Sequence, residues 1–166
     1  MSRRDVVDIS CQRRVEFRKG EYHYFDFRVV YRSGLVRLVA ARPASLLKYG
    51  ELVGRLEQFT NYSLKYHADE WQIMTDEDVT QAVFSHSANI LRARALKNEE
   101  DCMRMRRLLS GMSELIRITE LLKEFGRLGA ARTAMWNLID EGMLKHVSSE
   151  PGRKTITDIS YLRQCA

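Results

Sequence analysis

Apolar and polar side chains alternate along the first part of the chain in the way that β-strands require. Val15 and Phe17 fall on one side of an alternating segment, and the segment after it is dense in aromatic and β-branched residues. Residues 33–34 (Ser-Gly) predict a hairpin turn, and Pro43 ends the strand before it because proline has no N–H to donate to a ladder. The pattern predicts three strands, over residues 11–19, 22–32 and 35–41.

A helical period replaces the alternation after Pro43. Leucines and other apolar residues recur on one face of residues 44–59, which predicts an amphipathic helix. Residues 70–75 predict a short buried strand. Thr75 and the three acids after it predict the start of another helix, since a capping side chain and negative charge both suit a helix N-terminus. The order β-β-β-α-β-α predicts a small α/β domain over residues 1–97.

From residue 98 the chain is helical in period and then changes to strands. Three helices are predicted, over residues 99–109, 113–125 and 129–141. Two short strands follow, over residues 143–147 and 154–159, with a Pro-Gly turn in residues 148–153 between them. Three helices followed by a hairpin is the order of a winged helix-turn-helix. Residues 98–166 are therefore predicted to form an all-α/winged helix-turn-helix domain.

Composition indicates a globular protein, with 45% hydrophobic and 30% charged residues and no apolar run of membrane-spanning length. The net charge of +5 is unevenly placed: residues 1–37 carry nine Lys and Arg against five acids, and residues 103–154 carry ten against six. Residues 38–102 carry seven against ten. Basic ends of this kind favour polyanions such as DNA, although ordinary solvated surface gives the same count.

Cysteine and histidine show no metal-binding spacing. The three cysteines are far apart without a C-x-x-C pair, and the four histidines are scattered. The first residues are basic without an apolar run behind them, so no signal peptide is expected. We expect reduced thiols, no bound metal, no membrane association and a cytoplasmic location.

In a winged helix, the third helix presents its solvent face to the DNA major groove and the hairpin approaches phosphates. Trp136 is expected in the core, and Gly142 is expected to end the helix in a left-handed cap. Asp140 and Glu141 would repel phosphate, so a wing that faces protein rather than DNA is the alternative. The residues expected to contact DNA are Arg127, Arg132 and Asn137 on the helix, with Lys145, Arg153 and Lys154 on the wing.

Four segments of the chain together resemble a known family. They are Y-F-D-F-R-V (24–29), L-V-A-A-R-P (38–43), W-Q-I-M-T-D-E-D-V (71–79) and N-I-L (89–91). In this order they are similar to TnsA-type transposon endonucleases, over about residues 12–160. The resemblance implies an α/β restriction-endonuclease-like domain followed by a winged helix, and partners among DNA, transposase and other mobile-element or phage proteins. A homodimer is compatible with such a fold.

The departures from that family concern its catalytic residues. Asp26 matches the first metal-binding acid, but Ala40 stands at the second acid and Arg42 at the lysine. Alanine offers no ligand to Mg²⁺, and arginine stays protonated and cannot act as a tuned lysine does. We therefore expect a degenerate, inactive endonuclease. A rearranged active site with Mg²⁺ would need an acid from the next helix, namely Glu51 or Glu57.

Three functions follow from these observations. The first is a pseudoenzyme that binds or assembles on DNA without cutting it, with Arg42 and Lys48 among its DNA contacts. The second is an active Mg²⁺-dependent endonuclease with a rearranged site. The third is an inhibitor or regulator that uses the nuclease-like fold to bind protein.

Overall fold

The computed structural model describes residues 5–47, 50–147 and 155–165. The chain forms two compact units, which divide between Val79 and Thr80. We call residues 3–79 the N-terminal unit and residues 80–166 the C-terminal unit. The sequence pattern instead places the domain boundary at residue 97. The difference is one helix, α3 (Gln81–Ala95), which packs against a later helix of the C-terminal unit, α6 (Leu128–Asp140).

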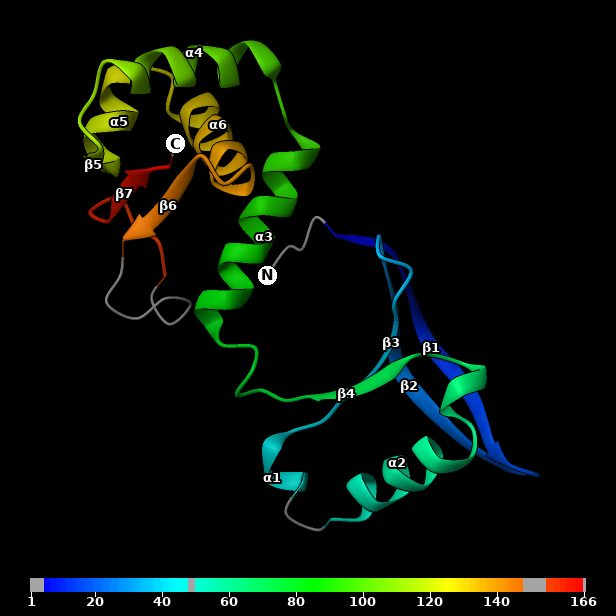
Figure 1. Ribbon diagram of the computed structural model, residues 1–166. Helices are drawn as coiled ribbons and strands as arrows, with labels where there is room; N and C mark the ends of the chain where they lie inside the picture. Colours follow the sequence, from blue (N-terminus) through cyan, green and yellow to red (C-terminus); the bar gives the residue numbers. More distant parts are fainter. Residues whose placement is uncertain (1–4, 48–49, 148–154, 166) are drawn as a thin grey trace. The chain divides into compact units, whose positions relative to one another are not determined.

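A four-stranded mixed sheet of order β1-β2-β3-β4 forms the N-terminal unit (Figure 1). Its first three strands are antiparallel neighbours, and the fourth pairs parallel with the third. The strands are β1 (Val6–Arg18), β2 (Glu21–Tyr31), β3 (Val36–Ala41) and β4 (Glu70–Met74). The connection from β3 to β4 contains α1 (Ala44–Leu47), α2 (Glu51–Tyr62) and a 3-10 helix, η1 (Leu64–Tyr66). The predicted α/β character is thereby confirmed.

The core of the N-terminal unit lies between the sheet and α2. It contains Val15, Phe17, Phe25, Leu38, Ala40, Leu56, Phe59 and Leu64. The prediction of one continuous helix over residues 44–59 is wrong, because the structure has two helices there, α1 and α2. Gly50 has a φ of 68°, which glycine adopts without strain, and α2 begins directly after it.

The helix start predicted at Thr75 is also wrong, because Asp78 uses its carboxylate locally. That carboxylate accepts hydrogen bonds from the backbone N–H of Thr75 at 2.8 Å and from the Thr75 hydroxyl at 2.9 Å. These bonds close a turn instead of a helix. The cap of α3 is Thr80, whose side chain accepts a hydrogen bond from the N–H of Val83.

Helices α3, α4 (Glu99–Ser110), α5 (Ile118–Phe125) and α6 make up most of the C-terminal unit. A three-stranded antiparallel sheet of order β5-β7-β6 completes it. Its strands are β5 (Leu115–Arg117), β6 (Leu144–Val147) and β7 (Tyr161–Gln164). The end of α6 is capped as predicted: Gly142 has a φ of 80°, its N–H donates to Ile139, and the N–H of Met143 donates to Leu138.

Two predictions for this unit need correction. Residues 115–117 belong to a strand rather than to the helix predicted over 113–125, because they pair with β7. The returning strand of the hairpin is β7. Residues 155–159 of the strand predicted over 154–159 form no strand, and residue 154 lies outside the described residues. Pairing of Leu162 with His146 places Leu162 in the core, whereas Ile159 is exposed. The predicted Pro-Gly turn over 148–153 lies outside the described residues.

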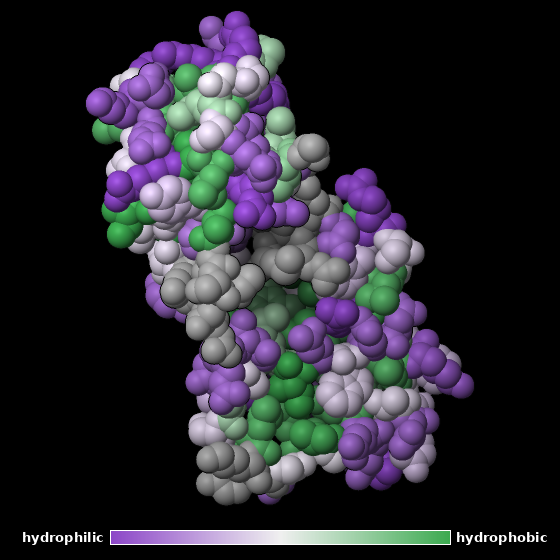
Figure 2. All heavy atoms as spheres, turned by 60° about the vertical axis from the view of Figure 1, so that its left-hand side comes forward, coloured by the Kyte–Doolittle hydropathy of each residue, from purple (hydrophilic) through white to green (hydrophobic). Residues whose placement is uncertain are grey.

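Hydrophobic patches interrupt a largely hydrophilic surface on the face that Figure 2 presents. Exposed apolar side chains occur in both units, including Leu46 on α1 and Phe84 on α3. Among the described residues, no helix combines the length and the apolar character needed to span a bilayer.

Candidate functional site

Asp26, on β2, is held against the end of β3. Its Oδ2 accepts a hydrogen bond from the backbone N–H of Ala41 at 2.7 Å and another from Nη1 of Arg42 at 3.0 Å. The ladder between β2 and β3 extends only to the pair Phe27–Val39. The N–H of Ala41, which would bond to β2 if the ladder were longer, therefore donates to the carboxylate of Asp26 instead.

Arg42 brings a permanent positive charge to this position. Its Nη1 donates both to Oδ2 of Asp26 and to the backbone oxygen of Ala41, the latter at 2.5 Å. Its own backbone N–H donates to Met74 of β4, which fixes the residue at the sheet end. The guanidinium thus lies between a carboxylate oxygen and a carbonyl oxygen, which are the ligand types that a hard cation selects.

Ala40 supplies a methyl group to the core instead of a second acid to this site. Its side chain is fully buried and packs in the cluster that contains Leu38 and Leu56. In the part of the chain that the structure describes, no three His, Cys, Asp or Glu side chains are grouped as metal ligands. Asp26 and Arg42 form an ion pair at the end of the strand, with 3.0 Å between Oδ2 and Nη1.

His23 interacts electrostatically with this pair and also with Arg55, and the sequence pattern singled out neither His23 nor Arg55. His23, on β2, is buried with its ring edge against Phe25 at a centroid distance of 4.8 Å. Burial lowers the pKa of His23, and the positive charges of Arg55 and Arg42 lower it further, while Asp26 acts in the opposite direction. Arg55 comes from α2. Alternation with Phe25 could have predicted that His23 is buried, but nothing in the sequence joins Arg55 to it.

The Nε2 atom of His23 is buried and has no hydrogen-bond partner among the described residues. An unsatisfied buried polar atom costs about 1–3 kcal/mol. We expect His23→Phe to stabilise the N-terminal unit by about 1 kcal/mol at pH 7, because it removes that atom and keeps an aromatic ring. Hydrogen exchange of the β2 amides measures this difference.

The same substitution should change the pH dependence of stability. A histidine whose folded pKa lies below its unfolded value of about 6.5 binds more protons when unfolded, so stability falls as the pH drops below about 6.5. We expect the protection of the β2 amides from hydrogen exchange to decline in the wild-type protein between about pH 7 and 5. The same protection should decline less in the His23→Phe variant. An equal decline in both proteins would contradict the assignment.

Glu51 and Glu57 are the acids that a rearranged metal site would need. Both are exposed on α2. Glu57 lines a shallow pocket with Glu70 and Trp71, at the first residues of β4. Ala41, beside Asp26, pairs with Met74 at the opposite end of that strand. The structure therefore does not bring Glu57 to Asp26, and no hydrogen bond among the described residues joins Glu51 to it.

Asn137 was expected to be exposed on the third helix, and that expectation is wrong. It is buried, and its Nδ2 donates to the backbone oxygens of Ala93 and Thr133, each at 3.0 Å. Ala93 belongs to α3, the helix that the sequence pattern assigned to the other domain. On the same side of α6, Trp136 is buried as expected, with its ring 5.2 Å from that of His86 on α3.

The remaining expected DNA contacts differ in their surroundings. Arg127 and Lys145 are exposed. Arg132 is also exposed, but it forms a bidentate pair with Asp158 at 2.8 and 2.6 Å, which raises the pKa of Arg132 and lowers that of Asp158. The other three expected contacts lie outside the described residues: Lys48, Arg153 and Lys154.

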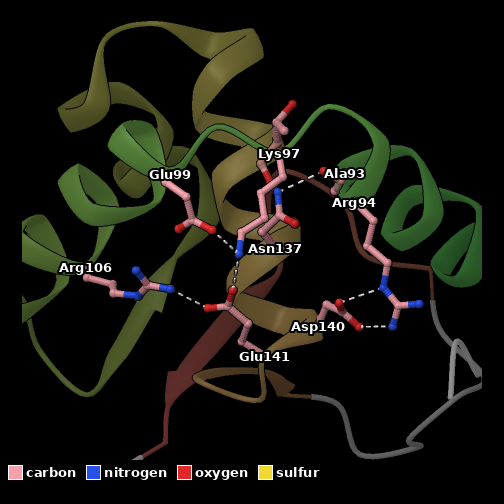
Figure 3. A network of polar contacts seen from close by, with 9 residues as sticks. Ala93, Arg94, Lys97, Glu99, Arg106, Asn137, Asp140 and Glu141 are labelled. Carbon is pink, nitrogen blue, oxygen red and sulfur yellow. Dashed lines mark hydrogen bonds and ion pairs between the residues drawn. The ribbon is translucent and has the colours of Figure 1, made fainter. Parts of the chain in front are cut away.

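The two acids at the end of α6 are engaged in ion pairs (Figure 3). Asp140 accepts two hydrogen bonds from Arg94 of α3, both at 2.8 Å. Glu141 accepts from Arg106 of α4 at 2.6 Å and lies 3.1 Å from Nζ of Lys97. Burial acts to raise the pKa of Glu141, but these two cations outweigh it and hold the pKa below its ordinary value. The negative charges of Asp140 and Glu141 are therefore largely balanced within the C-terminal unit.

Comparison with known proteins adds no assignment to this geometry. No family model matches the chain, and no curated protein sequence does.

Proposed function

We propose that the protein binds DNA without cutting it. In this proposal the N-terminal unit is a degenerate restriction-endonuclease-like domain of the TnsA type, and the C-terminal unit is a winged helix. The observation that carries it is the position of Arg42, whose Nη1 lies between Oδ2 of Asp26 and the carbonyl oxygen of Ala41. A resident cation of fixed charge at that point leaves Asp26 balanced without Mg²⁺.

The order of elements supports the two fold assignments. Three antiparallel strands, a crossover that contains α2 and a parallel fourth strand accord with the arrangement implied by the TnsA-type resemblance. Three helices, α4 to α6, followed by the β6–β7 pair accord with a winged helix. Helix α3 is an addition to that pattern.

Contacts with DNA would fall on the first turn of α6 and on β6. Helix α3 covers the middle of α6 through Asn137 and Trp136, which removes that face from a groove. Arg127 and Lys145 are exposed at either end of this region. Such cations gain affinity by releasing counterions from phosphates, and the gain depends steeply on salt.

A cleavage assay with a parallel gel-shift tests the proposal. Purified protein is incubated with supercoiled and linear DNA in Mg²⁺, in Mn²⁺ and in EDTA, and duplex affinity is measured over a salt series. We expect no cleavage and a salt-dependent shift. The logarithm of the affinity falls linearly with the logarithm of the salt concentration. The double variant Arg127→Ala, Lys145→Ala should make this slope shallower by about two, because each phosphate contact contributes about one.

Lys123→Ala is the control for the salt dependence. It removes an exposed cation from α5 and should leave the slope of log affinity against log salt concentration unchanged. Metal-dependent nicking that Asp26→Ala abolishes would overturn the proposal in favour of an active endonuclease.

A protein-binding regulator is the second candidate function, and one observation favours it. The face of α6 that reads bases in a winged helix is occupied here by α3. If neither duplex nor single-stranded DNA binds at low salt, this second function replaces the first.

A further inference from the structure

The N-terminal unit carries four exposed tyrosines, each with basic residues near it in the chain or the fold. They are Tyr22 and Tyr24 on β2, Tyr62 at the end of α2 and Tyr66 in η1. Their exposed fractions are 38, 57, 59 and 72% in that order. Four large aromatic rings this open to solvent within one small unit are unusual, because such rings normally contribute to a core.

A cation lies over three of these rings. The Cζ of Arg14 is 3.7 Å from the centroid of Tyr22, and the Cζ of Arg18 is 4.7 Å from that of Tyr62. Nζ of Lys65 is 5.0 Å from the centroid of Tyr66. All three cationic residues are exposed.

Backbone pairing and two contacts of Arg14 and Arg18 connect the tyrosines of β2 and of α2 to strand β1. Arg14 faces Tyr24 across the β1–β2 ladder, and its guanidinium reaches Tyr22 on the same strand. The hydroxyl of Ser63 donates to the backbone oxygen of Glu16 at 2.8 Å, which fastens the end of α2 to β1 beside Arg18. Tyr62 is thereby held next to the hairpin. We call the set Arg14, Arg18, Tyr22, Tyr24 and Tyr62, which these contacts connect around the edge strand β1, the tyrosine surface.

The charge of this region suits a polyanion. Residues 11–24 carry four Arg and Lys against two acids. One of the two acids, Glu16, accepts a hydrogen bond from the N–H of Gly20 and so serves the hairpin turn. Cations next to open aromatic rings are the combination that tracks a phosphate backbone while unpaired bases stack.

We infer that the tyrosine surface binds single-stranded nucleic acid. Tyr24 and Tyr62 stack on bases, and Arg14 and Arg18 contact phosphates. A duplex offers only its backbone to such a surface because its bases are already stacked and paired, so the open rings discriminate in favour of single strands. This inference concerns the N-terminal unit and does not rest on duplex binding by the C-terminal unit.

Fluorescence anisotropy of the full chain tests the inference with two labelled probes, a 20-nucleotide oligo-dT and a 20-base-pair duplex. Tyr24→Leu and Tyr62→Leu should each weaken oligo-dT binding by about 5- to 150-fold, the range of one lost base stack, and leave duplex binding nearly unchanged. Tyr24→Phe should retain affinity, because it keeps the ring.

The matched control is Tyr161→Leu, which removes a similarly exposed tyrosine from the C-terminal unit. It should not alter oligo-dT binding. Equal losses for both probes, an unchanged affinity in the leucine variants, or no oligo-dT binding by the wild-type protein at low salt would each overturn the inference. Duplex binding without an effect of the tyrosines would overturn it while leaving the proposed function intact.

Discussion

Replacing Arg94 with alanine is expected to destabilise the C-terminal unit by about 3–5 kcal/mol. The carboxylate of Asp140 is only 4% exposed and accepts two hydrogen bonds from Arg94, both at 2.8 Å. Removal of the guanidinium takes both of these hydrogen bonds and one positive charge away from a buried carboxylate. Loss of one partner of a buried pair costs far more than the intact pair contributes.

The measurement is urea unfolding followed by tryptophan emission. Trp71 and Trp136 are the two tryptophans, one in each unit, so a Trp71→Phe background makes Trp136 the reporter of the C-terminal unit. A lower midpoint with an unchanged slope is expected, since the variant changes stability and not the surface exposed on unfolding.

The matched control is Arg132→Ala. Arg132 and Asp158 also form a bidentate pair, with distances close to those between Arg94 and Asp140. Their side chains, however, are 47% and 46% exposed. Solvent screens that pair, so its loss should cost less than about 1 kcal/mol. Equal losses from Arg94→Ala and Arg132→Ala would show that burial of Asp140 does not decide the effect.

The pattern of side chains predicted elements whose burial is decided locally. Alternation around Val15 and Phe17 predicted β1 because one face of that strand is covered and the other is solvated. Gly142 predicted the end of α6 because the required φ is positive. Such features depend on neighbours in sequence, and a single sequence contains them.

Features decided by distant packing were not predictable. Asn137 has the composition of an exposed base-reading residue, and it is buried because α3 lies against α6 and accepts its hydrogen bond. The segment from Thr155 to Ile159 has strand-like residues, but the register of β6 selects Tyr161–Gln164 instead. Neither the burial of Asn137 nor the position of β7 can be recognised from the residues next to them in the sequence.

The grouping of Asp26, Ala40 and Arg42 came from the resemblance to TnsA-type endonucleases. The resemblance and the side-chain pattern indicated the positions of these residues but not their contacts. They did not indicate that Arg42 bonds directly to Asp26, or that Ala40 packs in the core. His23 lies on the same strand as Asp26, whereas Arg55 comes near His23 only because α2 packs against the sheet, which is a tertiary arrangement.

Replacing Ala40 with glutamate should not produce nuclease activity, and it should destabilise the N-terminal unit by about 3–5 kcal/mol at pH 7. Ala40 is fully buried beside Leu38 and Leu56, so a larger side chain overpacks the core, and its charge enters an apolar environment. Arg42 already occupies the oxygens of Asp26 and Ala41. We therefore expect no Mg²⁺-dependent cleavage from the variant and faster hydrogen exchange in β3.

Ala40→Gln is the control that separates volume from charge, because glutamine has nearly the shape of glutamate without its ionisation. Burial raises the pKa of a carboxyl, so the glutamate variant binds more protons when folded and loses stability as the pH rises above about 4.3. The two variants should therefore converge as the pH falls from 7 towards 4.5 and separate above it. If instead the glutamate variant matches the glutamine variant at pH 7 and gains stability from Mg²⁺, the new acid reaches Asp26 and the two carboxylates bind the metal together.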